Sequence, residues 1–311
     1  MKNRVIFFSG GKSSFSVADY VKNKYPEDNI LLYFTDTLWE DEDLYRFIHE
    51  ASNKLKLPLL IHSRGITPPQ LMVMQKFMAN SRVGTCSKEL KMKVAADYFK
   101  KGIVPEIEIW HNKHFLKSEY FTEDPTLYFG ISFEEMHREI PIRENWKPFD
   151  VAMPLIDNAI DNDEVLAKWN IRQPKLYLQN FSHNNCGGRC IKGGQRHFLN
   201  LLLKNEDRYM ALMEQEIIIS EYIRYSRQCK GKDYLFDEVW KFVTTGEKSA
   251  KLQHIIDTFK YTKNWNFGDR TSPYTFMKKM GLEELEKRPA QCDMFDYGGC
   301  GCFVEYGAMA V

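Results

Sequence analysis

The sequence lacks both a strong net charge and a long apolar run. Its 311 residues carry a formal charge of +1, so no overall basic field attracts nucleic acid, although a local basic patch stays open. No stretch approaches the roughly 20 apolar residues that cross a bilayer, and the run Val5–Phe8 is too short for a secretory signal. We therefore expect a cytoplasmic protein with no membrane partner. With 43% hydrophobic residues, the chain can form one large domain or two smaller ones.

Two familiar phosphate-binding patterns are also missing. The segment Phe8–Ser14 reads FSGGKSS, but Ile6 stands where a Walker loop needs its first glycine, and no G-x-G-x-x-G pattern follows a strand. What remains is an apolar strand, Ser-Gly-Gly-x-x-Ser and a helix. Glycines let a backbone approach an anion, and amides at a helix start bind it, whereas the alternative is a plain strand-to-helix turn. The predicted phosphate-binding residues are Ser9, Gly10, Gly11, Lys12, Ser13 and Ser14.

Apolar runs alternate with helical periodicity in the first half of the chain. Short continuous runs at Val5–Phe8, Ile30–Phe34 and Pro58–Ile61 predict strands buried on both faces, and Glu106–Trp110 fits a fourth strand. Leu44 to Leu55 has the spacing of an amphipathic helix. This alternation predicts right-handed crossovers and a parallel sheet, which binds ligands beyond the carboxyl ends of its strands.

The seven cysteines are unevenly placed. In a reducing compartment they indicate metal binding or thiol chemistry more often than disulfides. Two closely spaced pairs could converge on one tetrahedral centre, for which Zn²⁺ and a [4Fe-4S] cluster both suit four thiolates; reduced cysteines in loops are the alternative. The predicted ligands are Cys186, Cys190, Cys300, Cys302 and Cys292, with His183 in reserve. Because helical periodicity dominates after about residue 180, we expect a nucleotide-binding domain at 1–180 and a helical, cysteine-rich metal-binding domain at 181–311.

Several motifs together resemble a known family. FSGGKSS resembles the PP-loop of N-type ATP pyrophosphatases, whose usual form is Ser-Gly-Gly-x-Asp-Ser. Elements similar to the phosphoadenosine-phosphosulfate (PAPS) reductase-like branch follow in order: FTDT at 34–37 with Glu40, Arg82 with CSKELK at 86–91, and Gly130-Ile131 with Glu134, Glu135 and Arg138. PLI at 154–156 and HNNCGGRCIK at 183–192 look like a subgroup from phages and bacteria. The resemblance covers roughly residues 1 to 200.

The resemblance implies an α/β fold with a HUP-type parallel sheet, helices on both faces, and a bound adenosine nucleotide. In such enzymes ATP is cleaved between its α and β phosphates and an acceptor is adenylated, or an activated adenylyl sulfate such as PAPS is bound. We therefore expect an ATP pyrophosphatase, sulfurtransferase-type or PAPS reductase-like enzyme, whose sulfur acceptor is a nucleic acid or a small molecule. Ser13 replaces the family's aspartate, so Asp36 is expected to place Mg²⁺; capping the loop after the second strand is its alternative role.

Basic residues and one cysteine complete the predicted site. Lys88 and Lys91 are three apart, hence on one helix face, and with Arg82 they would neutralise phosphate or sulfate. Cys86 would be a nucleophile because a helix start and nearby lysines lower a thiol pKa; a packed side chain is the alternative. The predicted catalytic residues are Lys12, Asp36, Arg82, Cys86, Lys88, Lys91 and Arg138. The predicted nucleotide contacts beyond the loop are Phe34, Asp36, Thr37 and Gly130.

Two local interactions are expected after Gly130. Ser132 and Glu135 fit a capping box, and Glu134 and Arg138 lie one helical turn apart and would pair.

Two other functions stay open. In one, a cysteine attacks an activated sulfate and releases sulfite, although the Glu-Cys-Gly-Leu-His tail of true PAPS reductases is missing. In the other, the protein is a non-catalytic nucleotide sensor or partner-binding module, for which Ser13 is the best support. Homo-oligomerisation is left open by the sequence.

Overall fold

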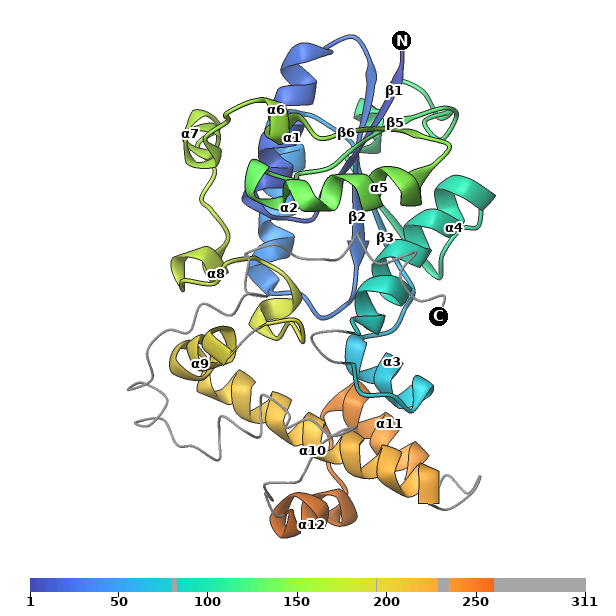
Figure 1. Ribbon diagram of the computed structural model, residues 1–311, viewed down its shortest axis with the longest axis vertical. Coiled ribbons are helices and arrows are strands. Elements are labelled where there is room, and N and C mark those ends of the chain that lie inside the picture. The colour runs from blue at the N-terminus through green and yellow to red at the C-terminus, as the bar shows by residue number, and fades with distance from the viewer. Residues whose placement is uncertain (80–82, 194, 229–234, 260–311) are drawn as a thin grey trace. The chain divides into compact units, whose positions relative to one another are not determined.

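The computed structural model describes the chain apart from residues 80–82, 194, 229–234 and 260–311 (Figure 1). The described chain divides into two compact units. The first comprises Met1–Gly65 and Thr85–Gly188, and the second comprises Ile66–Gly84 and the residues from Arg189 on. The segment Ile66–Gly84 thus groups with later residues, which a boundary at residue 180 does not anticipate. Four predicted site residues lie outside the described residues: Arg82, Cys292, Cys300 and Cys302.

The first unit alternates strands and helices, as the apolar runs predicted. Its elements are β1 (Asn3–Phe7), α1 (Lys12–Lys24), β2 (Asn29–Asp36), α2 (Glu42–Leu55), β3 (Leu59–Ser63), the π-helix η1 (Ser87–Met92), α4 (Lys93–Lys101), β4 (Ile107–His111), the 3₁₀ helix η2 (Lys113–Phe115), β5 (Thr126–Tyr128), the 3₁₀ helix η3 (Phe133–Arg138), α5 (Glu139–Trp146), β6 (Asp150–Ala152), α6 (Pro154–Asp157), α7 (Asn162–Lys168), α8 (Lys175–Leu178) and η4 (Cys186–Gly188).

The strands form one six-stranded sheet in the order β4-β3-β2-β1-β5-β6. All neighbours are parallel except β3 and β4, which pair antiparallel. The expectation of a parallel sheet is therefore confirmed for five strands and wrong for β4. β4 is an edge strand whose side chains are half-buried or exposed, unlike the fully buried strands in the middle of the sheet. An edge strand bonds to one neighbour alone and can run in either direction without disturbing the rest of the sheet.

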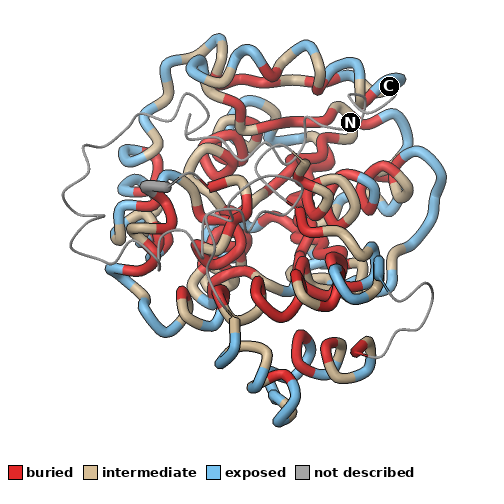
Figure 2. The backbone as a smooth tube through the Cα atoms, turned by 60° about the horizontal axis from the view of Figure 1, so that its bottom comes forward, coloured by how far each residue is buried: buried red, intermediate tan, exposed pale blue. Residues whose placement is uncertain are grey.

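Helices cover both faces of the sheet, which explains the continuous apolar runs. Alternate residues of β1 point to opposite sides: Ile6 packs with α1, α2 and α7, whereas Val5 and Phe7 pack with α4 and α5. All eight residues of β2 are buried, and the buried core of the fold is visible as the red backbone in Figure 2. A strand buried on both sides must be apolar throughout, so the doubly covered α/β sheet follows directly from the pattern.

The second unit is helical in its described residues. It contains α3 (Pro68–Gln75), α9 (Gln195–Lys204), α10 (Glu206–Gln228), α11 (Phe236–Thr245) and α12 (Ala250–Thr258). The long helix α10 packs against each of the other four, and Gln70 of α3 donates a 2.9 Å hydrogen bond to Thr244 of α11. Within the described residues, no helix is long and apolar enough to span a membrane.

Candidate functional site

A cavity of about 130 Å³ lies in the first unit at the carboxyl ends of β1, β2 and β5. The ends of these strands form its floor, and the loop after β1 forms one wall. Other walls come from η1, from η3, from α8 and from residues 182–185. Because the carboxyl edge of an open α/β sheet is where such folds bind ligands, the cavity stands where the sequence predicted a site.

The loop Ser9–Ser14 is held open by two glycines. Gly10 has a positive φ of 77°, and a side chain there would also meet Leu44 Cγ at 2.9 Å. A side chain at Gly11 would meet the Tyr177 hydroxyl at 2.9 Å. The loop is braced by Ser14, whose hydroxyl donates to the Gly11 carbonyl at 2.9 Å. Glycine is therefore required at both positions by the backbone conformation or by a close neighbour.

The first turn of α1 opens beside the cavity. Its N-cap is Gly11, which has no side chain to bond the amides that follow. The Lys12 amide bonds the Tyr177 hydroxyl, and the amides of Ser13 and Ser14 keep their capacity for an anion. Of the predicted phosphate cradle, the four residues Ser9, Gly11, Ser13 and Ser14 line the cavity.

Gly130 contacts the same turn from the other side. A Cβ atom on Gly130 would lie 2.8 Å from Ser14 N and 3.0 Å from the carbonyl carbon of Ser13. Both are backbone atoms that cannot move aside without changing the loop. Gly130 and Phe34, two predicted nucleotide contacts, also line the cavity.

Two buried cations line the cavity. Lys91, which is 4% exposed, pairs with Glu40 at 3.2 Å, and Arg138, which is 6% exposed, pairs with Glu135. Glu40 is in turn bound by the Thr37 hydroxyl at 3.0 Å and by the Cys186 amide. Lys91 of η1 and Arg138 of η3 are far apart in the sequence, yet both line one cavity. This arrangement suits a ligand with a polyanionic part.

The other predicted cations lie elsewhere. The ammonium group of Lys12 bonds Asp163 of α7 at 2.8 Å, and Lys12 does not line the cavity. Lys88 is half-buried and does not line it either. η1 is a π-helix in which the Lys93 amide bonds the Lys88 carbonyl, five residues back, so residues three apart are not stacked as in an α-helix. This geometry separates Lys88 from Lys91.

Asp36 caps the loop after β2. Its Oδ1 accepts hydrogen bonds from the Leu38 amide at 2.7 Å and from the Tyr45 hydroxyl at 2.9 Å. Burial raises the pKa of the Asp36 carboxyl above its ordinary value, against the effect of these two bonds. Neither Asp36 nor Thr37 lines the cavity. These contacts are those expected if Asp36 caps the loop after β2. A role of Asp36 in placing Mg²⁺ stays a prediction.

The expected capping box after Gly130 is wrong. Ser132 makes no side-chain cap bond to η3, and Glu135 instead pairs with Arg138. Glu134 is exposed and does not pair with Arg138 as expected. In a 3₁₀ helix one turn is three residues, so Arg138 lies above Glu135 rather than above Glu134.

The described cysteines are buried outside the cavity. Cys86, Cys186 and Cys190 form no disulfide, and none of the three lines the cavity. Within the described residues no cluster of three or more His, Cys, Asp or Glu side chains forms a metal site. Because Cys292, Cys300 and Cys302 lie outside those residues, the predicted metal centre remains a prediction.

A segment that the sequence did not assign to the loop forms part of the cavity wall. Tyr177 of α8 places its hydroxyl against the backbone of Gly11 and Lys12, and burial raises the pKa of Tyr177 to about 12, so it is neutral near pH 7. His183, Asn184 and Asn185 also line the cavity. The signal available in the sequence was the HNNCGG motif, but nothing in its spacing shows that it folds back on the loop.

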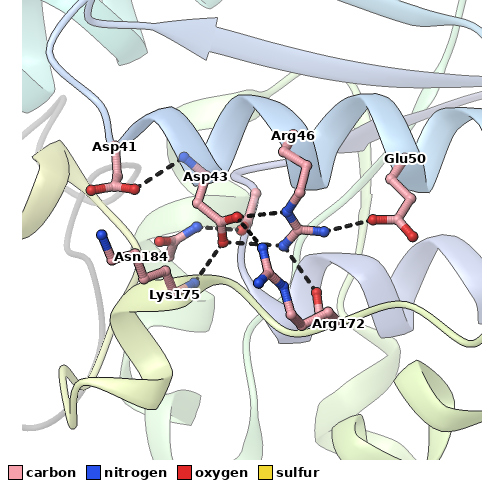
Figure 3. Close-up of polar contacts among 8 residues, drawn as sticks. Asp41, Asp43, Arg46, Glu50, Arg172, Lys175 and Asn184 are labelled. Carbon is pink, nitrogen blue, oxygen red and sulfur yellow. Dashed lines mark hydrogen bonds and ion pairs between the residues drawn. The ribbon is translucent and has the colours of Figure 1, made fainter.

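Asp43 of α2 anchors this segment (Figure 3). Its carboxylate accepts from Arg46 at 2.6 Å, from Arg172 at 2.8 Å and from the Lys175 amide at 2.7 Å. Burial opposes ionisation, but Arg46 and the Lys175 amide hold the pKa of the Asp43 carboxyl below its ordinary value. Arg46 also donates to the Arg172 carbonyl at 3.0 Å. The chain that leads into α8 is thereby tied to the helix that follows β2.

The comparison with family models agrees with this geometry. Residues 3–102 match the model described as the phosphoadenosine phosphosulfate reductase domain. The match begins at β1 and includes the loop, β2 and Lys91. No curated protein and no solved structure matches the chain. The resemblance to the PAPS reductase-like family is thus confirmed over residues 3–102, where the family model matches.

Proposed function

We propose that the protein is an enzyme that binds ATP or an adenylyl sulfate, with the anionic tail of the nucleotide at the Ser9–Ser14 loop. The nucleotide would serve either to adenylate an acceptor or to deliver a sulfur-bearing adenylate. The acceptor would be a nucleic acid or a small molecule that takes up sulfur.

One observation carries the proposal. An uncapped helix start and two buried cations, Lys91 and Arg138, line the same cavity at the carboxyl edge of the sheet. Amides and buried cations both favour negative charge, and a low-dielectric setting strengthens each contribution. Each cation is paired with one carboxylate, Lys91 with Glu40 and Arg138 with Glu135, so the two pairs are neutral and the loop amides add donors for an anion. A phosphate or sulfate group satisfies this combination better than a neutral ligand does.

Binding can be tested by removing one cation at a time. Arg138→Gln should weaken ATP binding roughly 10- to 100-fold, because a charge-assisted hydrogen bond contributes about 1.5–3 kcal/mol. Arg143→Gln is the matched control: Arg143 pairs with Glu139 at 2.8 Å and does not line the cavity, so we expect a change of less than about threefold. Calorimetry that finds equal losses for both variants, or no ATP binding by the wild type, would contradict the proposal.

The reaction can be assigned from its products. Adenylation of an acceptor by ATP releases pyrophosphate, whereas thiol-dependent reduction of PAPS releases sulfite. The described cysteines do not line the cavity, so the reductase reaction would require Cys229, Cys292, Cys300 or Cys302. Pyrophosphate without sulfite would support adenylation, and sulfite that disappears in a quadruple Cys→Ser variant would support reduction. Nucleotide binding without either product would identify a nucleotide sensor.

A further inference from the structure

Asn184 is a buried side chain in the cavity wall with incomplete hydrogen bonding. It is 2% exposed, and its Nδ2 donates a 3.0 Å hydrogen bond to the Gly10 carbonyl (Figure 3). Its Oδ1 is enclosed by the protein and accepts no hydrogen bond from the described residues. Buried polar atoms nearly always have a partner, which is a protein group, an ordered water or a ligand. Because Asn184 lines the cavity, a donor on the ligand can take this place.

The bond to Gly10 fixes which atom is left over. If the amide were turned over, Oδ1 would face the Gly10 carbonyl, and two acceptors would oppose each other. The nitrogen therefore belongs on the loop side, and the acceptor oxygen is the atom that has no partner among the described residues.

The position of Asn184 is set from both sides. On one side, the Asp43 network ties Arg172, which precedes α8, and Lys175, the first residue of α8, to α2. On the other side, the amide of Cys186 bonds Glu40, the carboxylate that pairs with Lys91. Asn184 thus lies between two anchored points and directly against the loop, which is the arrangement expected of a residue that must meet a ligand with fixed geometry.

We propose that Asn184 recognises the nucleoside part of the ligand through its Oδ1, while its Nδ2 holds the loop. This inference rests on the proposed nucleotide-binding function. Ionised phosphate and sulfate oxygens are acceptors and cannot satisfy another acceptor, so the partner must be an N–H or O–H group. In ATP the groups of this kind are the 6-amino group of adenine and the 2′- and 3′-hydroxyls of ribose. Asn184 therefore selects a nucleoside bearing a neutral donor beside the anionic tail.

The test is calorimetry with ATP and three analogues, which are 2′-deoxy-ATP, 3′-deoxy-ATP and purine riboside triphosphate. Wild-type protein should bind one analogue roughly 3- to 10-fold more weakly than ATP, because one neutral hydrogen bond is lost. Asn184→Leu and Asn184→Ala should bind ATP more weakly by a similar factor. Toward that one analogue, the loss caused by each variant should be smaller than its loss toward ATP, since the donor is already missing and only the bond to Gly10 is removed.

Two controls separate ligand recognition from damage to the loop. Inorganic tripolyphosphate has no donor, so the Asn184 variants should lose only what the missing bond to Gly10 contributes, which is less than their loss for ATP; an equal loss for tripolyphosphate and ATP would overturn the inference. Asn158→Ala removes an asparagine that also donates to a backbone carbonyl, that of Pro154, but does not line the cavity, and it should leave ATP binding unchanged.

Two further outcomes distinguish a failure of the Asn184 inference from a failure of the proposed function. Wild-type protein that binds ATP and all three analogues equally would overturn the inference while leaving the proposed function intact, and this result needs no variant to fold. Wild-type protein that binds neither ATP nor tripolyphosphate would remove the proposed function itself. Thermal unfolding of each variant shows whether its binding can be compared.

Discussion

At the scale of single residues, the proposed site depends on positions where only glycine fits and on buried side chains with specific partners. Gly10, Gly11 and Gly130 are fixed by close approaches, while Lys91 and Arg138 are cations buried with one carboxylate each. The loop could be predicted from the sequence because FSGGKSS is contiguous. The role of Tyr177 and Asn184 could not, because these side chains reach the loop through the fold from far along the chain.

Gly130→Ala should damage the loop more than its size suggests. The new methyl group would press on the backbone of Ser13 and Ser14, so we expect a loss of about 1–3 kcal/mol in the free energy of unfolding and at least tenfold weaker ATP binding. Chemical denaturation and calorimetry measure the two effects. Gly102→Ala is the control: its φ is positive, at 66°, and a Cβ there meets nothing within 4 Å, so stability should fall without a change in ATP affinity. ATP binding retained by Gly130→Ala would contradict the proposed place of the phosphates.

Asp36→Asn should change how stability depends on pH. Because burial raises the pKa of the Asp36 carboxyl above 3.8, the folded state binds its proton more tightly than the unfolded chain does. The wild type therefore loses stability from this group as the pH rises from about 3.8 through the raised pKa. The asparagine oxygen can still accept hydrogen bonds from Leu38 and Tyr45. The free energy of unfolding of the variant should therefore increase relative to that of the wild type as the pH rises.

Urea unfolding from about pH 4 to pH 7 tests this, with the exposed residue Asp163, changed to Asn, as the control. A stability difference between Asp36→Asn and the wild type that is constant over this range would refute the assigned pKa direction. Pyrophosphate release by Asp36→Asn answers a separate question. Normal pyrophosphate release would show that the carboxylate only caps the loop. Loss of pyrophosphate release would support a role of Asp36 in placing Mg²⁺.

At the scale of helices and strands, the sequence predicted what is regular and missed what is short. β1 and β2 are continuous apolar runs and α2 has a clear amphipathic period, so all three were found. β5 and β6 have three residues each, which is too short for a period to be recognised. The direction of β4 depends on pairing at the edge of the sheet, and the π-helical turn of η1 depends on local packing, so neither leaves a sequence signal.

Asp43→Asn should loosen the segment that carries Tyr177 and Asn184. The change removes the charge that holds Arg46 and Arg172, so we expect a loss of about 1–2 kcal/mol in stability and faster amide exchange in residues 172–185. Glu50→Gln is the matched control on the same helix, because Glu50 bonds Arg46 and makes no hydrogen bond to the described residues of this segment. Hydrogen–deuterium exchange that is equally slow in residues 172–185 of Asp43→Asn and wild type would show that Asp43 is not the anchor.

At the scale of the whole molecule, two compact units carry different parts of the prediction. The first unit holds the cavity, whose lining comes partly from the family match at residues 3–102 and partly from residues 129–185, and the second unit is helical in its described residues. Composition and periodicity were enough to predict an α/β sheet followed by helices. They could not show that Ile66–Gly84 groups with the second unit, because that grouping is made by contacts with α10 and α11 rather than by any boundary in the sequence.

The predicted metal centre is tested on the full chain. Protein purified without added metal should contain about one zinc ion, or about four irons with absorption at roughly 400 nm, per chain. Cys186→Ser and Cys190→Ser should each lower the metal content, whereas Cys86→Ser, outside the predicted ligand set, should not. Folded wild-type protein without bound metal would refute the centre and leave the nucleotide site unaffected.

The central claim is that the Ser9–Ser14 loop holds the anionic tail of an adenine nucleotide. Hydrogen–deuterium exchange with and without saturating ATP tests it most directly, with saturation established by calorimetry. The account predicts slower exchange in peptides that cover residues 9–16 and 128–138, and unchanged exchange in β4 at the far edge of the sheet. Bound ATP that leaves residues 9–16 unprotected, or no ATP binding at all, would contradict it.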